Sequence, residues 1–191
     1  MNKAIFLDRD GVLDALVWYP SHDEWESPRA PEDVELLPGV ADAIRTAARL
    51  GYLIFIVSNQ PSAAKGKVTL EALHAVHAEV LRQLGDVPIA EFFYCYHRAE
   101  DRCECRKPKP YFVQEAAKKY DLDLSASWFA GDQDGDIGCG RQAGVRTALL
   151  QYARSNPKRG AERADQSFDD LAHFVRWLAQ QDPSYVRETP N

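Results

Sequence analysis

The sequence predicts a three-layer α/β fold in which helices cover both faces of a central parallel sheet. Short apolar runs alternate with longer amphipathic segments, a pattern typical of alternating strands and helices. The first run, residues 4–7, is continuously apolar, as expected of a strand buried on both faces. A length of 191 residues allows one domain with a full core. We therefore expect one domain over residues 1–182 and a loose tail over residues 183–191.

The remaining elements follow from the same patterns. After the first strand, apolar runs predict strands at residues 52–57, 89–94, 127–130 and 145–150. Amphipathic stripes predict helices at residues 39–50, 69–84 and 110–120, a short helix ended by Gly144, and a closing helix after residue 167. Gly51 suits the end of the first helix, Thr69 can cap the second, and Ser167-x-x-Asp170 is similar to a capping box for the last.

Residues 12–33 show neither a helical nor a strand period. We expect a long loop or small flap directly after the first strand, and long ordered loops are often functional. The segment contains Trp18, Tyr19 and Trp25. These aromatic residues can cover a site like a lid, or they can simply pin the loop by hydrophobic contacts, and the sequence favours neither interpretation.

The composition narrows the class of protein. A net charge of −6 argues against a general nucleic-acid-binding surface. No apolar stretch is long enough to span a membrane, and the N-terminus lacks the pattern of a secretory signal. Four cysteines in a chain of this size do not suggest a disulfide framework. We expect a cytoplasmic monomer with neither a membrane nor a nucleic-acid partner.

Two carboxylates, Asp8 and Asp10, follow the first strand, and Gly11 comes next. In open α/β sheets, ligands bind outside the carboxyl ends of the strands. Carboxylates there can hold a divalent cation, act as a nucleophile or move a proton, although aspartate is also common in ordinary turns. Alternate strand residues point to opposite faces, so a turn at Gly11 would be needed to bring both carboxylates to one site.

Polar side chains also follow the later strands or occupy the loops after them: Ser58, Asn59, Arg106, Lys107, Asp132 and Asp136. A hydroxyl with nearby amides suits a phosphate oxygen, and a proline-restricted basic segment can aim charge at a phosphate. Carboxylates with water and substrate phosphate are typical ligands of Mg²⁺. Together the strand ends indicate metal-assisted phosphoryl transfer.

Four potential zinc ligands fall between residues 95 and 105: Cys95, His97, Cys103 and Cys105. A Cys₃His set can hold Zn²⁺ in tetrahedral geometry, and four protein ligands make a closed, structural site. Reduced surface thiols are the alternative. Cys139 lies far along the chain from the other cysteines and is expected to be a helix residue rather than a ligand.

Two lysines flank a glycine in the turn Lys65-Gly66-Lys67. Such a turn can steer an anion toward a site, or it can be an ordinary solvated turn.

These motifs resemble those of haloacid dehalogenase-type phosphatases. The resemblance rests on Asp-x-Asp-Gly at residues 8–11, Ser-Asn at 58–59, Lys107, and Gly-Asp-x-x-x-Asp at 131–136. The cysteine-rich loop and the Cys-Arg-Lys-Pro-Lys-Pro segment after it are similar to the branch that contains heptose bisphosphate phosphatases and histidinol-phosphatase domains. The likeness covers residues 5–150 and implies a Rossmann-like fold.

The resemblance implies a role for each carboxylate. Asp8 would attack phosphorus and form an aspartyl-phosphate, and Asp10 would act as the general acid and base. Mg²⁺ would be held by the carboxylates of Asp8 and Asp132 and by the main-chain carbonyl of Asp10. Asp136 would support these ligands without binding the metal itself.

The resemblance also implies which residues bind the substrate. Ser58 and Lys107 would bind the transferring phosphoryl group, with Asn59 beside them, and Arg106 would contact the rest of the substrate. It implies a small phosphorylated metabolite as that substrate and favours D-glycero-D-manno-heptose 1,7-bisphosphate. Histidinol phosphate is the alternative, and a zinc-stabilised binding module without catalysis or a phosphatase acting on nucleic-acid ends would be further ones.

Three positions depart from the heptose phosphatase pattern. Gln133 stands where a basic residue is common, Pro61 replaces a small polar residue, and residues 12–33 do not match the substrate loop of those enzymes in detail. Each departure concerns the expected substrate pocket rather than the expected chemistry.

Overall fold

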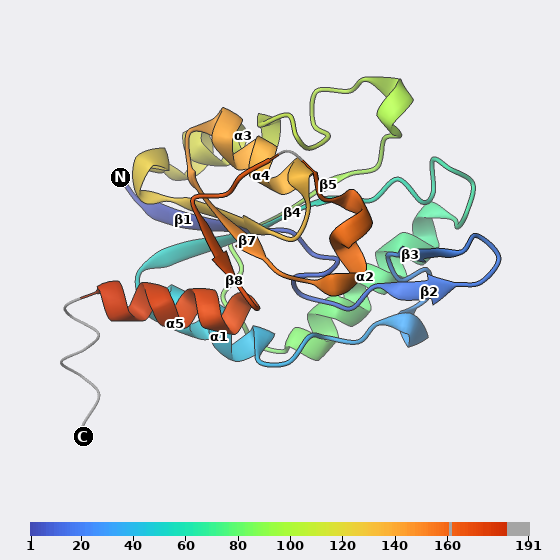
Figure 1. The fold of residues 1–191 in the computed structure, drawn as a ribbon, viewed down its shortest axis with the longest axis horizontal. Helices are drawn as coiled ribbons and strands as arrows, with labels where there is room; N and C mark the ends of the chain where they lie inside the picture. The colour runs from blue at the N-terminus through green and yellow to red at the C-terminus, as the bar shows by residue number, and fades with distance from the viewer. Residues whose placement is uncertain (161, 183–191) are drawn as a thin grey trace.

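The computed structural model describes residues 1–160 and 162–182, so the expected tail at 183–191 lies outside the described residues. It confirms the predicted α/β class, with a six-stranded parallel sheet between helical layers (Figure 1). In spatial order the strands are β5 (Glu91–Cys95), β4 (Tyr52–Asn59), β1 (Lys3–Leu7), β6 (Trp128–Gly131), β7 (Arg146–Leu150) and β8 (Gln166–Phe168). Because all pairs are parallel, the carboxyl ends of these strands lie along the same edge of the sheet.

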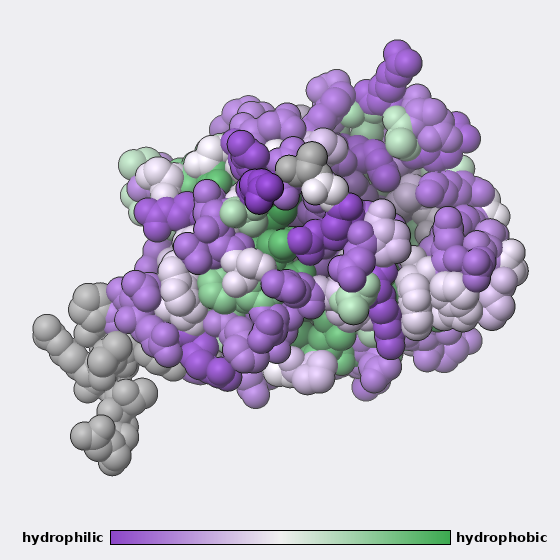
Figure 2. Space-filling model, in the orientation of Figure 1, coloured by the Kyte–Doolittle hydropathy of each residue, from purple (hydrophilic) through white to green (hydrophobic). Residues whose placement is uncertain are grey.

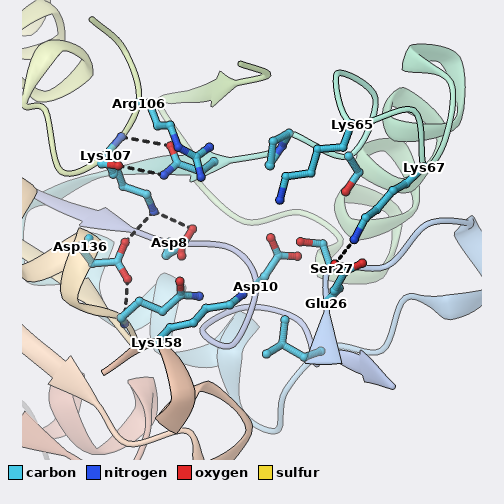
Figure 3. A pocket seen from close by; sticks show the side chains of 16 residues that line it. Asp8, Asp10, Glu26, Ser27, Lys65, Lys67, Arg106, Lys107, Asp136 and Lys158 are labelled. Atoms are coloured by element: carbon cyan, nitrogen blue, oxygen red, sulfur yellow. Dashed lines mark hydrogen bonds and ion pairs between the residues drawn. The ribbon is translucent and has the colours of Figure 1, made fainter. Parts of the chain in front are cut away.

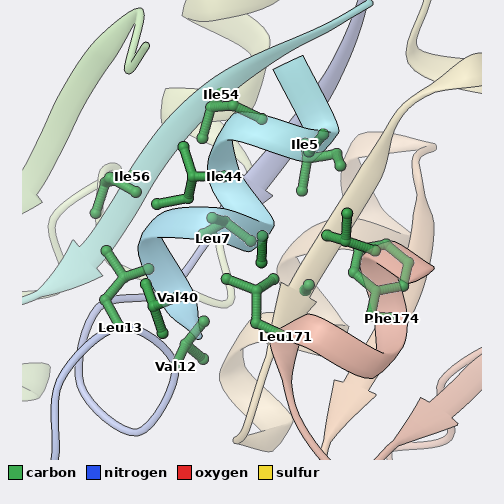
Figure 4. Packing of buried hydrophobic residues seen from close by; sticks show 14 of the residues in the cluster. Ile5, Leu7, Val12, Leu13, Val40, Ile44, Ile54, Ile56, Leu171 and Phe174 are labelled. Atoms are coloured by element: carbon green, nitrogen blue, oxygen red, sulfur yellow. The ribbon is translucent and has the colours of Figure 1, made fainter. Parts of the chain in front are cut away.

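Helices cover both faces of the sheet. One face packs against α1 (Val40–Arg49), α2 (Leu70–Leu84) and α5 (Leu171–Gln181), and the other against α3 (Tyr111–Tyr120) and α4 (Asp134–Ala143). The first strand shows why: Ile5 and Leu7 belong to one buried cluster, whereas Ala4 and Phe6 belong to the other. Figure 4 shows the first cluster, where these two β1 side chains meet residues of α1 and α5.

The ends of the helices mostly follow the predicted signals. Thr69 accepts a hydrogen bond from the backbone N–H of Ala72 at 3.2 Å, and Gly51 follows α1 with a φ of 83°. The expected capping box of the last helix is wrong, however. Ser167 lies in β8, an unpredicted sixth strand, and Asp170 caps α5 by accepting the N–H of His173 at 2.8 Å.

The segment at residues 12–33, expected to be a long loop or small flap, contains a small antiparallel hairpin of β2 (Val17–Tyr19) and β3 (Glu24–Glu26). Its two tryptophans, Trp18 and Trp25, pair with their ring centroids 5.4 Å apart. The guanidinium of Arg154 lies 4.1 Å from the ring of Trp25, and its Nη1 donates to the carbonyl of Leu16 at 2.9 Å. The hairpin is therefore held both by its own aromatic residues and by a distant segment.

Four short 3₁₀ helices complete the description: η1 (Pro31–Asp33), η2 (Ala99–Asp101), η3 (Leu124–Ala126) and η4 (Ala153–Lys158). On the face seen in Figure 2, hydrophilic residues dominate and the hydrophobic ones gather near the middle, between the helical layers. Within the described parts of the chain, no helix has both the length and the apolar character needed to cross a bilayer.

Candidate active site

A cavity of about 210 Å³ opens where the carboxyl ends of the strands meet (Figure 3). Most of the predicted site residues line it: Asp8, Asp10, Asn59, Arg106, Lys107 and Asp136. The turn after β1 places the side chains of both Asp8 and Asp10 on this cavity, as the sequence analysis expected of a turn at Gly11. Gly11 has a φ of 83°, and a side chain on it would strike the carboxylate of Asp132, so only glycine fits this turn.

Three buried carboxylates form a cluster, which we call the carboxylate cluster: Asp8, Asp132 and Asp136. Asp8 and Asp136 line the cavity, whereas Asp132 is fully buried and is not among the lining residues. One oxygen from each lies within 4.8 Å of the others. Oδ2 of Asp132 accepts a hydrogen bond from Ser155, whereas its buried Oδ1 has no hydrogen-bond partner among the described residues. Burial, followed by the charges of Asp136 and Asp8, raises the pKa of Asp132 well above its ordinary value. A bound divalent cation would relieve this repulsion, so the cluster fits a metal site.

Lys107 neutralises part of the cluster. Its Nζ lies 2.8 Å from Oδ1 of Asp8 and 2.6 Å from Oδ1 of Asp136, and it donates to the carbonyl of Val57 at 2.7 Å. Although burial opposes the effect, the charges of Asp136 and Asp8 raise the pKa of Lys107, so the ammonium group stays charged. Burial raises the pKa of Asp136 to about 6, although the charge of Lys107 opposes this effect. Its Oδ2 also accepts the backbone N–H of Gln133 at 3.0 Å, at the start of α4.

The carboxylate of Asp10 is held on both oxygens by two residues that the sequence analysis missed. Arg9, whose side chain is 1% exposed, approaches Oδ1 with Nη2 at 2.5 Å and Nε at 3.2 Å. Gln60 donates from Nε2 to Oδ2 at 2.5 Å, and also to the hydroxyl of Ser58 at 3.1 Å. In the sequence, the only indication of a role was position: Arg9 lies between the two aspartates, and Gln60 directly follows Ser-Asn. The side chain of Asp10 is not part of the carboxylate cluster, and its predicted metal contact is through the main chain.

The two residues of the Ser-Asn pair at the end of β4 differ in their relation to the cavity: Asn59 lines it and Ser58 does not. Ser58 is 1% exposed and is not one of the residues that line the cavity, so its role in phosphate binding stays a prediction. The side-chain amide of Asn59 makes two hydrogen bonds to the backbone of Lys107. Oδ1 accepts the N–H at 3.1 Å, and Nδ2 donates to the carbonyl at 3.2 Å. Asn59 thus fixes the segment that carries Lys107.

The predicted zinc ligands come together in residues 95–105, which we call the cysteine loop. The Sγ of Cys103 lies 3.6 Å from the Sγ of both Cys95 and Cys105. Nδ1 of His97 lies 3.7 Å from the Sγ of Cys95 and 3.4 Å from that of Cys105. Tetrahedral ligands about 2.3 Å from a zinc ion would lie about 3.8 Å apart, close to the distances found here, so the loop has the dimensions of a four-ligand zinc site.

Two further contacts concern this loop. Arg106, immediately after it, donates from Nη1 to the carbonyl of His97 at 3.1 Å, so the loop directs this cavity residue. Cys139 is not among the four potential zinc ligands of the cysteine loop, as expected, and its thiol donates to the carbonyl of Lys109 at 3.4 Å.

The segment between β7 and β8 is polar in sequence, yet it supplies two site residues. Ser155 is fully buried and donates to Asp132, and Lys158 lines the cavity. Nothing in the local sequence distinguishes these residues from those of a solvated loop, because their contacts depend on the fold.

Comparison with known proteins agrees with this site. The HAD-hydrolase-like family model matches residues 104–174. D-glycero-β-D-manno-heptose-1,7-bisphosphate 7-phosphatases are similar over most of the chain. The one from Pseudomonas putida is 33% identical over 184 residues, which cover 92% of this chain and 99% of the relative. The one from Helicobacter pylori is 32% identical over 153 residues, which cover 78% of this chain and 83% of the relative.

Solved structures give the same result. The D,D-heptose 1,7-bisphosphate phosphatase from Bordetella bronchiseptica, complexed with magnesium and phosphate, superposes with a TM-score of 0.81 at 28% identity. The match covers 94% of this chain and 99% of that one. A putative HAD-like phosphatase from Mesorhizobium loti gives a TM-score of 0.73 at 28% identity, covering 93% and 85% of the two chains.

The chain therefore belongs to the haloacid dehalogenase-like hydrolases, in the family of the D-glycero-β-D-manno-heptose-1,7-bisphosphate 7-phosphatases. This confirms the resemblance drawn from the four motifs and the cysteine loop. It also confirms that the chain is an enzyme, a phosphoric monoester hydrolase.

Proposed function

We propose that this chain is a Mg²⁺-dependent phosphatase that removes the 7-phosphate of D-glycero-β-D-manno-heptose 1,7-bisphosphate through an aspartyl-phosphate on Asp8. The observation that carries the proposal is the carboxylate cluster beside the charged amine of Lys107, with Asp8, Asp136 and Lys107 lining a cavity. The relatives named above support the substrate, since their names state this activity.

The first half-reaction transfers the phosphoryl group to the enzyme. A carboxylate oxygen of Asp8 attacks phosphorus, and the bond from phosphorus to the sugar oxygen breaks. Asp10 donates its proton to the departing alkoxide, and Arg9 and Gln60 hold it in position to do so. Lys107, 2.8 Å from Asp8, neutralises charge that develops on the phosphoryl oxygens.

The second half-reaction returns the enzyme to its starting state. Asp10, now ionised, accepts a proton from a water molecule, whose oxygen attacks the phosphorus of the aspartyl-phosphate. The bond between phosphorus and Asp8 breaks, and inorganic phosphate leaves. The same carboxyl group thus acts first as an acid and then as a base, which fits its fixed position in both half-reactions.

Two metal ions complete the proposal. Asp8, Asp132 and the main-chain carbonyl of Asp10 would hold Mg²⁺, which would supply positive charge to the transferring phosphoryl group. Asp136 would support these ligands through its contact with Lys107. The cysteine loop would hold a structural Zn²⁺ through its three thiolates and His97. The monomeric state, the cytoplasmic location and the single domain over residues 1–182 stay predictions.

The test is phosphate release with Mg²⁺ from heptose 1,7-bisphosphate, histidinol phosphate and a panel of hexose phosphates. The proposal predicts strong turnover of the heptose bisphosphate and loss of that turnover in Asp8→Asn. Release from histidinol phosphate alone would contradict the substrate and favour the alternative from the sequence. Absence of turnover on every substrate, with both metals supplied, would favour the non-catalytic binding module.

A further inference from the structure

The cavity has two ends that differ in chemistry (Figure 3). Asp8, Lys107 and Asp136 gather at one end, where phosphoryl transfer is proposed. At the other end, beyond Asp10, the cavity is lined by residues from the hairpin and from the turn after β4: Glu26, Ser27, Lys65 and Lys67. None of these residues has a role in the proposed chemistry.

Lys67 belongs to a partly buried group of charges that joins the hairpin to this turn. Its Nζ forms an ion pair with Glu26, which also pairs with Arg29. The side chains of Lys67, Glu26 and Arg29 are 18%, 15% and 16% exposed, so these are not freely solvated surface ions. Although burial opposes it, hydrogen bonds from Lys67 and Arg29 lower the pKa of Glu26 to about 2. One carboxylate is thus shared by two cations, and the group carries net positive charge.

The same group is fixed in place on both sides. The guanidinium of Arg29 lies 3.8 Å from the ring of Tyr19, and the backbone N–H of Lys67 donates to the carbonyl of Ser62 at 2.9 Å. A cation that is already held by its surroundings loses little conformational freedom when it binds an anion. Lys65, two residues earlier, adds a second ammonium group to the same end of the cavity.

The position of Asp10 determines which part of a substrate reaches these lysines. Because Asp10 would protonate the leaving oxygen, the rest of the leaving group must extend past Asp10, away from Lys107. Figure 3 shows Lys65 and Lys67 on that far side. Arg106, by contrast, lies next to Lys107 along the chain and is directed by the cysteine loop.

We propose that Lys67, with Lys65 beside it, binds a second phosphate group carried by the leaving portion of the substrate. The inference rests on the proposed function, since a sugar bisphosphate carries its second phosphate on that portion. Lys67 shares its charge between Glu26 and the incoming phosphate, so the hairpin contributes to substrate choice. This use of the hairpin and of the turn after Pro61 involves two of the three departures from the heptose phosphatase pattern.

The experiment compares kcat/KM for heptose 1,7-bisphosphate and heptose 7-phosphate, with p-nitrophenyl phosphate as a substrate that carries no second phosphate. A charge-assisted hydrogen bond in a partly exposed site suggests a preference of about tenfold for the bisphosphate in the wild type. Lys67→Met should remove most of this preference and change kcat/KM for the other two substrates by less than about twofold. Lys67→Arg should restore it, and Lys118→Met, on the exposed face of α3, is the matched control.

The outcomes separate this inference from the proposed function. Equal turnover of the two heptose phosphates by the wild type, or an equal loss on both in Lys67→Met, would overturn the second phosphate site alone. Failure to hydrolyse either heptose phosphate, with p-nitrophenyl phosphate still cleaved, would overturn both the proposed substrate and this site.

Discussion

The two candidate metal sites found among the described residues are built in opposite ways. The cysteine loop takes all its ligands from residues 95–105 and surrounds a centre with four donors. The carboxylate cluster takes Asp8 from the end of β1 and its other members from the segment after β6, and it leaves one oxygen of Asp132 without a hydrogen bond among the described residues. The first arrangement is closed and suits a structural ion, whereas the second remains open to a substrate.

The difference shows how one site can support the other without sharing its chemistry. The cysteine loop runs directly into Arg106 and Lys107, and it holds Arg106 through the carbonyl of His97. Asn59, at the end of β4, then holds the backbone of Lys107 through two hydrogen bonds. We therefore expect the loop to position cations for the cavity, and loss of its metal to affect stability more than the reacting groups.

Selective removal of Mg²⁺ is expected to have the largest effect. Loss of a cation that stabilises the phosphoryl group costs several kcal/mol, so kcat should fall on the order of 10²-fold to 10³-fold and recover when Mg²⁺ is returned. Dialysis against a chelator chosen to spare zinc, followed by elemental analysis and a turnover assay, measures this. Turnover that persists without Mg²⁺ would contradict the role given to the carboxylate cluster.

Substitution of Gln60 should have the next largest effect. Gln60→Leu removes the donor to Oδ2 of Asp10, and we expect kcat on a sugar phosphate to fall about 10-fold to 100-fold. The fall should be smaller on p-nitrophenyl phosphate, because nitrophenolate leaves without a proton. Gln114→Leu, at an exposed position of α3, serves as the control. Equal losses on both substrates would indicate that Gln60 is structural and does not position the general acid.

Substitution within the cysteine loop should have the smallest effect on turnover. Cys103→Ser is expected to lower the zinc content and to reduce the Tm by about 5–10 °C, because a ligand of a structural site is lost. At a temperature where the variant is folded, kcat should stay within a few-fold of the wild type. Cys139→Ser, which leaves the four potential zinc ligands intact, should have the same zinc content as the wild type. Unchanged zinc in Cys103→Ser would contradict the ligand assignment.

Much of the fold could be predicted because the signals are local. The expected strands are all present, each within two residues of its expected ends, and the cysteine loop was identified from the spacing of its ligands. The elements that were missed lack such signals. β8 is an edge strand of three residues with largely exposed side chains, and the hairpin strands are equally short. β8 and β3 contain no apolar run. β2 is apolar, but a strand of three residues is too short for a strand period to be evident.

The candidate site was predictable where residue type alone suggests chemistry, and not where contact depends on the fold. Asp8 and Lys107 stand in recognisable motifs. Ser155, by contrast, lies 23 residues from Asp132 in a polar segment, and its contact exists only because the fold brings η4 to the residue that follows β6. Arg9 is a buried cation that composition would place on the surface, and only the neighbouring carboxylates explain its burial.

The most direct measurement is mass spectrometry of the enzyme quenched in acid during turnover of heptose 1,7-bisphosphate with Mg²⁺. The proposed mechanism predicts a covalent phosphoryl group that maps to the peptide containing Asp8 and is absent from Asp8→Asn. A phosphoryl group on another residue, or rapid turnover with no phosphorylated enzyme at any quench time, would contradict the assignment of Asp8 as the nucleophile.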